Sequence, residues 1–83
     1  MDLRQLRTFL HVAELGSLSK AAERLRIAQP ALGRQMKLLE EELGVALFSR
    51  HGRGMVPTAA GRILADRASA ILRLVANTRA ELL

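Results

Sequence analysis

The chain has 83 residues and a formal net charge of +5, and 49% of its residues are hydrophobic. This composition is typical of one small globular domain and excludes an intrinsically disordered chain. The sequence contains no cysteine, which excludes disulfides and thiolate metal sites and fits a reducing cytoplasm. It contains no long apolar run, so neither a signal peptide nor a membrane span is expected.

The positive charge is concentrated in one short segment. Residues 46–62 carry Arg50, Arg53 and Arg62 without an acidic residue, whereas residues 1–45 carry seven basic and six acidic side chains. A basic segment of this kind is either a contact for a polyanion or a solvated loop. Both phenylalanines lie among other apolar residues and are expected in the core, which disfavours a stacking surface for single-stranded nucleic acid.

The spacing of apolar residues predicts two helices in the N-terminal part. The first covers residues 3–15, and Asp2 precedes it as the N-cap. The second helix is short, has Ser17 or Ser19 as its N-cap, and ends at a tight connection over residues 26–28.

A longer third helix is predicted to begin at Gln29 or Pro30 and to end at Gly44. Proline is accepted in a first helical turn, where its missing N–H has no partner anyway. Gln29, Gly33 and Lys37 follow one another at intervals of four. They therefore share one polar or small face, which is expected to point outward.

Two further elements are predicted after the third helix. Within residues 46–57, the turn-forming residues 51–54 separate two short segments that are expected to be strands. Together they are expected to form a two-stranded hairpin. Thr58 then caps a helix that continues to the C-terminus, over a length of about 37 Å. Apolar residues recur along this helix in steps of four and three, which indicates a heptad seam for a partner helix. The seam consists of Leu64, Ala68, Ile71, Val75, Thr78 and Leu82.

This order of elements predicts a function. A short helix, a tight turn and a longer helix with a polar N-terminal face form a helix-turn-helix unit, whose second helix enters the major groove of DNA. Residues 29–43 are the predicted recognition helix, and the hairpin over residues 46–57 is directed to the minor groove or the backbone. The predicted fold class is mainly α: a winged helix-turn-helix with a three-helix core, a two-stranded wing and a long C-terminal linker helix.

Three residues of the recognition helix have alternative interpretations. Gln29 pairs with adenine or is a polar group without a target. Pro30 touches a thymine methyl group or only begins the helix. Arg34 reaches phosphate or guanine, or is a plain surface charge. The full set of candidate DNA contacts is Ser19, Gln29, Pro30, Gly33, Arg34, Lys37, Arg50 and Arg53.

The remaining candidates are mostly basic. Lys37 and Ser19 are placed to contact phosphate, and Arg50 is either a contact or a solvated charge. Arg53 at the tip of the hairpin suits a narrow minor groove. The three glutamates of residues 40–42 point in different directions on a helix and form no acid–base or metal cluster. The sequence predicts no catalytic residue, metal site or cofactor, and therefore no enzyme.

Several motifs resemble the LysR-type transcriptional regulators, and together they extend over most of the chain. They are GSLSKAAERL at 16–25, IAQPAL at 27–32, RQ at 34–35, LEEELG at 39–44, LFSR at 47–50 and PTAAG at 57–61. The resemblance implies a winged helix-turn-helix over residues 1–57 and a linker and dimerisation helix over residues 58–83. It also implies an absent C-terminal domain through which a small-molecule effector acts, so the chain is expected to be a fragment.

Two residues depart from the family pattern. Members of the family usually carry serine or threonine where this chain has Ala28, and serine where it has Gly33. Ala28 supplies no side-chain N-cap. Gly33 removes a hydroxyl that the family points toward DNA, and it costs about 0.5–1 kcal/mol of helix stability relative to alanine. It also permits a closer approach of the backbone to DNA.

The predicted function is sequence-specific binding of double-stranded DNA by a cytoplasmic homodimer that reads an inverted repeat, or by a tetramer in a full-length protein. The dimer is expected to use Leu64, Ala68, Ile71, Val75 and Leu82. One alternative is a helical dimerisation or interaction module without specific DNA binding. Another is an architectural protein that binds all duplexes alike.

Overall fold

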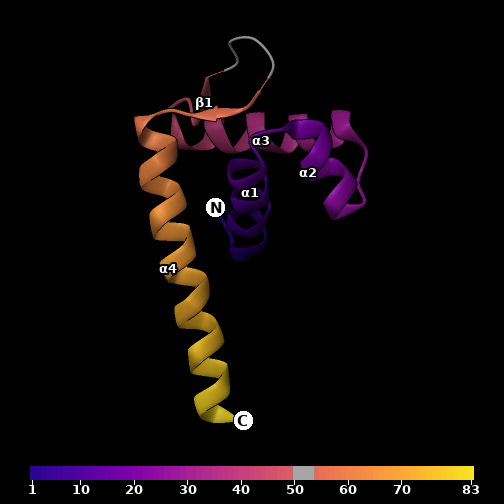
Figure 1. Ribbon diagram of the computed structural model, residues 1–83. Helices are drawn as coiled ribbons and strands as arrows, with labels where there is room; N and C mark the ends of the chain where they lie inside the picture. The colour runs from indigo at the N-terminus through magenta and orange to yellow at the C-terminus, as the bar shows by residue number, and fades with distance from the viewer. Residues whose placement is uncertain (50–53) are drawn as a thin grey trace.

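The computed structural model describes residues 1–49 and 54–83. Figure 1 shows that α3 and the two short strands lie at one end of the molecule and that α4 descends from them to the C-terminus at the other end. The mainly α, winged fold is the predicted one. Its elements are α1 (Leu3–Leu15), α2 (Leu18–Leu25), α3 (Gln29–Leu43), β1 (Phe48–Ser49), β2 (Val56–Pro57) and α4 (Ala59–Leu82).

Local capping fixes the ends of the helices. The Asp2 side chain accepts from the backbone N–H of Gln5 at 2.8 Å, and the side-chain oxygen of Gln5 accepts from the backbone N–H of Asp2, so α1 begins with a capping box. Ser17, rather than Ser19, is the N-cap of α2 and accepts from Lys20 N–H at 3.2 Å. These bonds satisfy backbone donors that a helix start leaves without partners.

The hydrophobic core joins the first three helices to the wing. Phe9 of α1 is fully buried, and its ring centroid lies 5.2 Å from that of Phe48 in β1. Both phenylalanines are therefore core residues, as predicted. The strands pair antiparallel, with Phe48 opposite Pro57. The buried cluster consists of Phe9, Val12, Ala21, Ala22, Leu32, Met36, Leu39, Leu47, Phe48 and Met55.

The first part of α4 packs against its own domain. Thr58 caps the helix by accepting from Gly61 N–H at 3.1 Å and donates its hydroxyl to the carbonyl of Ala46 at 2.7 Å. Gly61 itself is buried and lies so close to the wing that a β-carbon there would be 2.1 Å from the carbonyl oxygen of Leu47. The start of α4 is thus fastened to the base of the wing.

This packing corrects the predicted heptad seam. Ala68 has no exposed surface within one chain, and Leu64 packs against the core, so both already have neighbours in their own domain. Leu64 and Ala68 were predicted to belong to the dimer seam, but α4 packs against α1, and these two residues leave little surface for a partner helix. Further along, Ile71 is 38% exposed and Leu82 is 79% exposed. Only the distal half of the seam remains open to a partner.

Candidate nucleic-acid interface

The outward side of α3 is the candidate reading surface. Leu32, Met36 and Leu39 bury the inner side of the helix, while Gln29 and Lys37 are exposed. The prediction that Gln29 and Lys37 point outward is therefore confirmed. Pro30 and Arg34 are exposed as well, so four of the predicted contacts are exposed on α3, the helix that lies at the end of the molecule opposite the C-terminus (Figure 1).

The start of α3 differs from the other helix starts. Ala28 is the N-cap with an extended backbone, no side chain caps the helix, and proline occupies its first turn. The absence of a side-chain cap was predicted from Ala28. Because the Ala28 side chain cannot accept a hydrogen bond, the first backbone N–H groups of α3 lack the side-chain cap that the other three helices have among the described residues.

Gly33 is half-buried and does not stand on the exposed surface beside Gln29 and Lys37. A β-carbon at this position would lie 3.3 Å from Cδ2 of Leu18 in α2. The space beside Gly33 is therefore occupied by the side chain of Leu18 from the same chain. Leu18, Pro30, Gly33 and Met55 line part of a groove with a volume of about 550 Å³ along this side of α3. Leu18 is half-buried, so it packs against the core and also borders this groove.

The other predicted contacts separate into two groups. Ser19 is exposed, and its Oγ lies 3.2 Å from Oγ of Ser17. It stands in the first turn of α2 and not on the α3 surface. Arg50 and Arg53 lie outside the described residues. On the two sides of residues 50–53, Phe48 in β1 and Met55 just before β2 belong to the buried core.

Glu40 ties the wing to the recognition helix. Its Oε2 accepts from the backbone N–H groups of Leu47 at 2.8 Å and Phe48 at 3.2 Å. A carboxylate that receives two backbone N–H bonds makes a strong, charge-assisted contact. Sequence reasoning considered this residue only as a member of an acidic cluster. Leu47 follows the end of α3, and no sequence pattern indicates that a helical glutamate will contact the backbone there.

Replacing Glu40 by alanine is expected to lower the free energy of unfolding by about 1–3 kcal/mol, because two partly buried N–H groups lose their acceptor. The exposed neighbour Glu41 supplies the matched control, since Glu41→Ala removes the same charge. Urea unfolding of the two variants measures the difference. Equal stabilities would show that the Glu40 contacts with the wing contribute nothing beyond charge.

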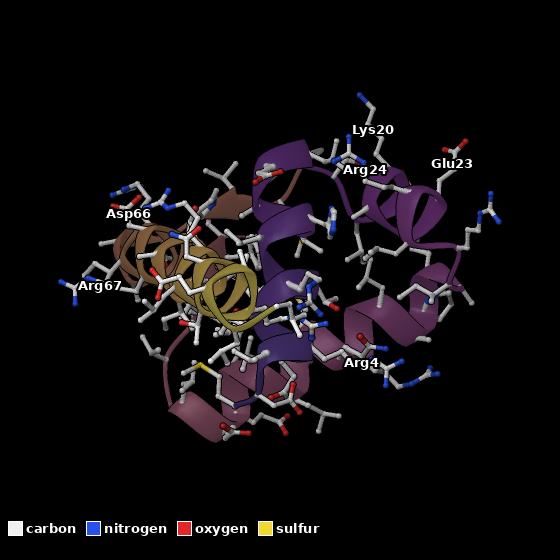
Figure 2. The ribbon with its side chains drawn as sticks, turned by 90° about the horizontal axis from the view of Figure 1, so that it is seen from below. Arg4, Lys20, Glu23, Arg24, Asp66 and Arg67 are labelled. Carbon is white, nitrogen blue, oxygen red and sulfur yellow. The ribbon has the colours of Figure 1, made fainter. Side chains whose placement is uncertain are left out.

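The first part of α3 carries the basic residues Arg34 and Lys37, which favour an anionic partner, and its three glutamates follow at residues 40–42. Arg34 and Lys37 form no ion pair with any other described residue; the ion pair found among those residues joins the amino group of Met1 to Glu42. Figure 2 shows Lys20, Glu23 and Arg24 extending from α2 into solvent. Exposed cations without carboxylate partners are available to phosphate oxygens.

Neither a metal site nor a membrane span is found in the described parts of the chain. Residues 1–49 and 54–83 include no group of three or more histidine, cysteine, aspartate or glutamate side chains that could hold a metal ion. No helix within these ranges combines the length and the hydrophobicity needed to cross a bilayer.

Comparison with known proteins agrees with this arrangement. Residues 3–62 match the family model described as "Bacterial regulatory helix-turn-helix protein, lysR family". The chain belongs to the LysR family. It is 47% identical over 75 residues to the HTH-type transcriptional regulator TfdT of Cupriavidus pinatubonensis, which covers 90% of the chain and 33% of that relative. It is 51% identical over 73 residues to the nitrogen assimilation regulatory protein nac of Escherichia coli, covering 88% of the chain and 24% of that relative.

Solved LysR-family structures share the fold. The crystal structure of the BenM_DBD/benA site 1 DNA complex superposes with a TM-score of 0.94 at 41% identity, covering 99% of this chain and 95% of that chain. The CbnR_DBD–DNA complex gives a TM-score of 0.91 at 43% identity, covering 98% and 93%. The chain spans only a quarter to a third of the TfdT and nac regulators. The similarity therefore concerns the helix-turn-helix part and its following helix.

Proposed function

We propose that this chain binds double-stranded DNA in a sequence-specific manner, as the DNA-binding part of a bacterial transcriptional regulator. The observation that carries the proposal is the exposed side of α3, where Gln29, Pro30, Arg34 and Lys37 lie together on a winged helix-turn-helix. The major groove is wide enough for one helix and presents a distinct pattern of donors and acceptors for each base pair. The BenM and CbnR domains of the same fold were crystallised as DNA complexes.

Each side chain has a proposed role in this interface. Gln29 at the start of α3 reads a base edge, since glutamine pairs with adenine through two hydrogen bonds. Arg34 reaches guanine or phosphate, and Lys37 contacts phosphate. Ser19 contacts the backbone from the start of α2. The wing, with Arg50 and Arg53, extends to the minor groove or the backbone.

The proposal includes a homodimer that reads an inverted repeat. Residues 1–57 bind DNA, and α4 connects two copies through its distal half, where Ile71 and Leu82 are exposed. Leaving apolar surface in water costs about 25 cal/mol per Å². In a full-length protein, a further domain would receive the small-molecule effector, and the assembly would be a cytoplasmic dimer or tetramer that regulates transcription without enzymatic activity.

Selection of binding sites from a random pool of duplexes tests the proposal. A sequence-specific dimer enriches an inverted repeat with half-sites about 34–36 Å apart, or a multiple of that distance. An architectural protein enriches no sequence and binds all duplexes alike. A pure dimerisation module shifts no duplex at moderate salt, and this result would overturn the proposal.

Variants of α3 distinguish base reading from phosphate contact. Gln29→Ala is expected to cost about 1–3 kcal/mol on the selected site and to relax the preference at one position per half-site. Lys37→Ala should weaken binding to all duplexes equally and reduce its salt dependence. Fluorescence anisotropy on selected and random duplexes at several salt concentrations measures both effects. If Gln29→Ala weakened both duplexes equally, Gln29 would not read a base.

A further inference from the structure

We infer that Glu40 is a positioning residue for DNA binding: its side chain holds the wing at a fixed place beside α3, so that α3 and the wing contact the same duplex together. This inference rests on the proposed DNA binding and adds to it a residue that is not among the predicted DNA contacts. Glu40 is half-buried near the end of α3, and its carboxylate is directed to the wing. We therefore expect it to act through the wing and not by its own contact with a base.

The connection from α3 to β1 is organised around Glu40. Its backbone carbonyl accepts from the N–H groups of Gly44 at 2.8 Å and Val45 at 3.2 Å, and these bonds end the helix. Its side-chain Oε2 accepts from the N–H groups of Leu47 at 2.8 Å and Phe48 at 3.2 Å. Backbone donors all along the connection therefore converge on this residue, and its side chain receives those that belong to the base of the wing.

The other side of the wing is held through the backbone. The N–H of Met55, just before β2, donates to the carbonyl of Gly16 at 3.0 Å, and Gly16 follows the end of α1. A β-carbon at Gly54 would lie 3.1 Å from the same oxygen, so the chain approaches this turn closely. The wing is thus attached to the helix-turn-helix on both sides. A substitution at Glu40 loosens the attachment of β1 and leaves the attachment beside β2 in place.

Two contacts on one duplex require a fixed separation between the elements that make them. When α3 lies in the major groove and the wing reaches the neighbouring minor groove or backbone, one DNA strand passes between them. A wing that is held in place before binding loses less conformational freedom on contact with DNA. The carbonyl bonds that end α3 do not involve the Glu40 side chain. A substitution there should therefore leave the reading surface in place and reduce the contribution of the wing.

The affinity gained from flanking DNA measures the contribution of the wing. One duplex ends at the edges of the half-site obtained by site selection, and a second is extended by about five base pairs, half a helical turn, at each end. Anisotropy at constant salt gives both dissociation constants. The wild-type chain is expected to bind the extended duplex about ten-fold more tightly, the factor that corresponds to one charge-assisted contact. Glu40→Ala should bring this ratio close to one, because its wing is no longer held in place before binding.

Two further variants separate positioning from charge. Glu41→Ala removes the same charge from the exposed neighbour and should keep the wild-type ratio. Glu40→Gln keeps an acceptor oxygen at the same reach and should restore most of the ratio that Glu40→Ala loses. A loss of stability does not imitate the effect. Partial unfolding weakens binding to both duplexes by the same factor, so the ratio is independent of the folded fraction.

The possible results are distinguishable. If neither duplex is bound, the proposed function fails and the inference fails with it. If the wild-type chain binds both duplexes equally, DNA binding stands, but the wing makes no contact for Glu40 to position and the inference is overturned. A Glu40→Ala chain that keeps the full ratio overturns it as well. If Glu40→Gln behaves like Glu40→Ala, the hydrogen bonds to the wing do not cause the effect, and the inference is again overturned.

Discussion

Gly61→Ala is expected to destabilise the domain by about 3 kcal/mol, which corresponds to a fall in Tm of about 12–24 °C for a domain of this size. The added β-carbon would lie 2.1 Å from the carbonyl oxygen of Leu47 and 3.1 Å from its carbonyl carbon. Both atoms belong to the backbone, so no rotamer change relieves the clash. Either α4 or the base of the wing must move away from the core.

The matched control is Gly33→Ala, a second glycine-to-alanine change within a helix. The nearest atom to its new β-carbon is the end of a flexible side chain at 3.3 Å, so this variant should keep or raise the wild-type stability. Differential scanning calorimetry of both variants gives the comparison. If the Gly61→Ala variant had the same Tm as the wild type, the first turn of α4 would be able to shift without loss of stability.

Val75→Asp is expected to weaken the proposed dimer by roughly 100-fold, since two copies of a valine side chain, each contributing at least about 1.5 kcal/mol when buried, are lost together. Val75 is half-buried within one chain and lies between Ile71 and Leu82 on the distal seam. The helix-turn-helix should remain folded, because the core residues lie elsewhere. Affinity for a palindromic duplex should fall toward the affinity for an isolated half-site.

Ala80→Asp provides the control for Val75→Asp. Ala80 is exposed and lies on the other side of α4 from the seam, so the same charge there should leave dimerisation unchanged. Sedimentation equilibrium measures the assembly, and anisotropy on palindromic and half-site duplexes measures DNA affinity. A wild-type chain that stayed monomeric at high concentration and bound half-sites as tightly as palindromes would contradict the dimer.

Local signals in the sequence were sufficient for the order of elements. N-cap side chains at Asp2 and Thr58, helical spacing and turn residues act over one or two helical turns, and the structure has the helices at the predicted positions. The outward side of α3 followed from the same periodicity. The spacing of apolar residues shows which side of a helix is buried, and it can be recognised without knowing how the rest of the chain folds.

Features that depend on contacts between distant segments could not be predicted in this way. The heptad pattern on α4 shows apolar spacing but not which neighbour covers it; Ala68 is fully buried within one chain, on a helix that packs against α1. Likewise, Glu40 reaches backbone donors of the wing, and Leu18 reaches the space above Gly33. A sequence pattern contains no distance between segments that meet only after folding.

Because α4 is attached rigidly to the base of the wing, a small rotation at the start of this long helix produces a large displacement at its far end. Thr58 bonds to Ala46, its N–H donates to the carbonyl of Leu47 at 2.9 Å, and Gly61 packs on the same backbone, so the helix starts at a fixed angle. A tilt of about 10° would move the far end of a 24-residue helix by roughly 6 Å. In a dimer joined at the far ends of α4, a change in the crossing angle of the two α4 helices would therefore move the two helix-turn-helix units. Their spacing along the duplex would change with that angle.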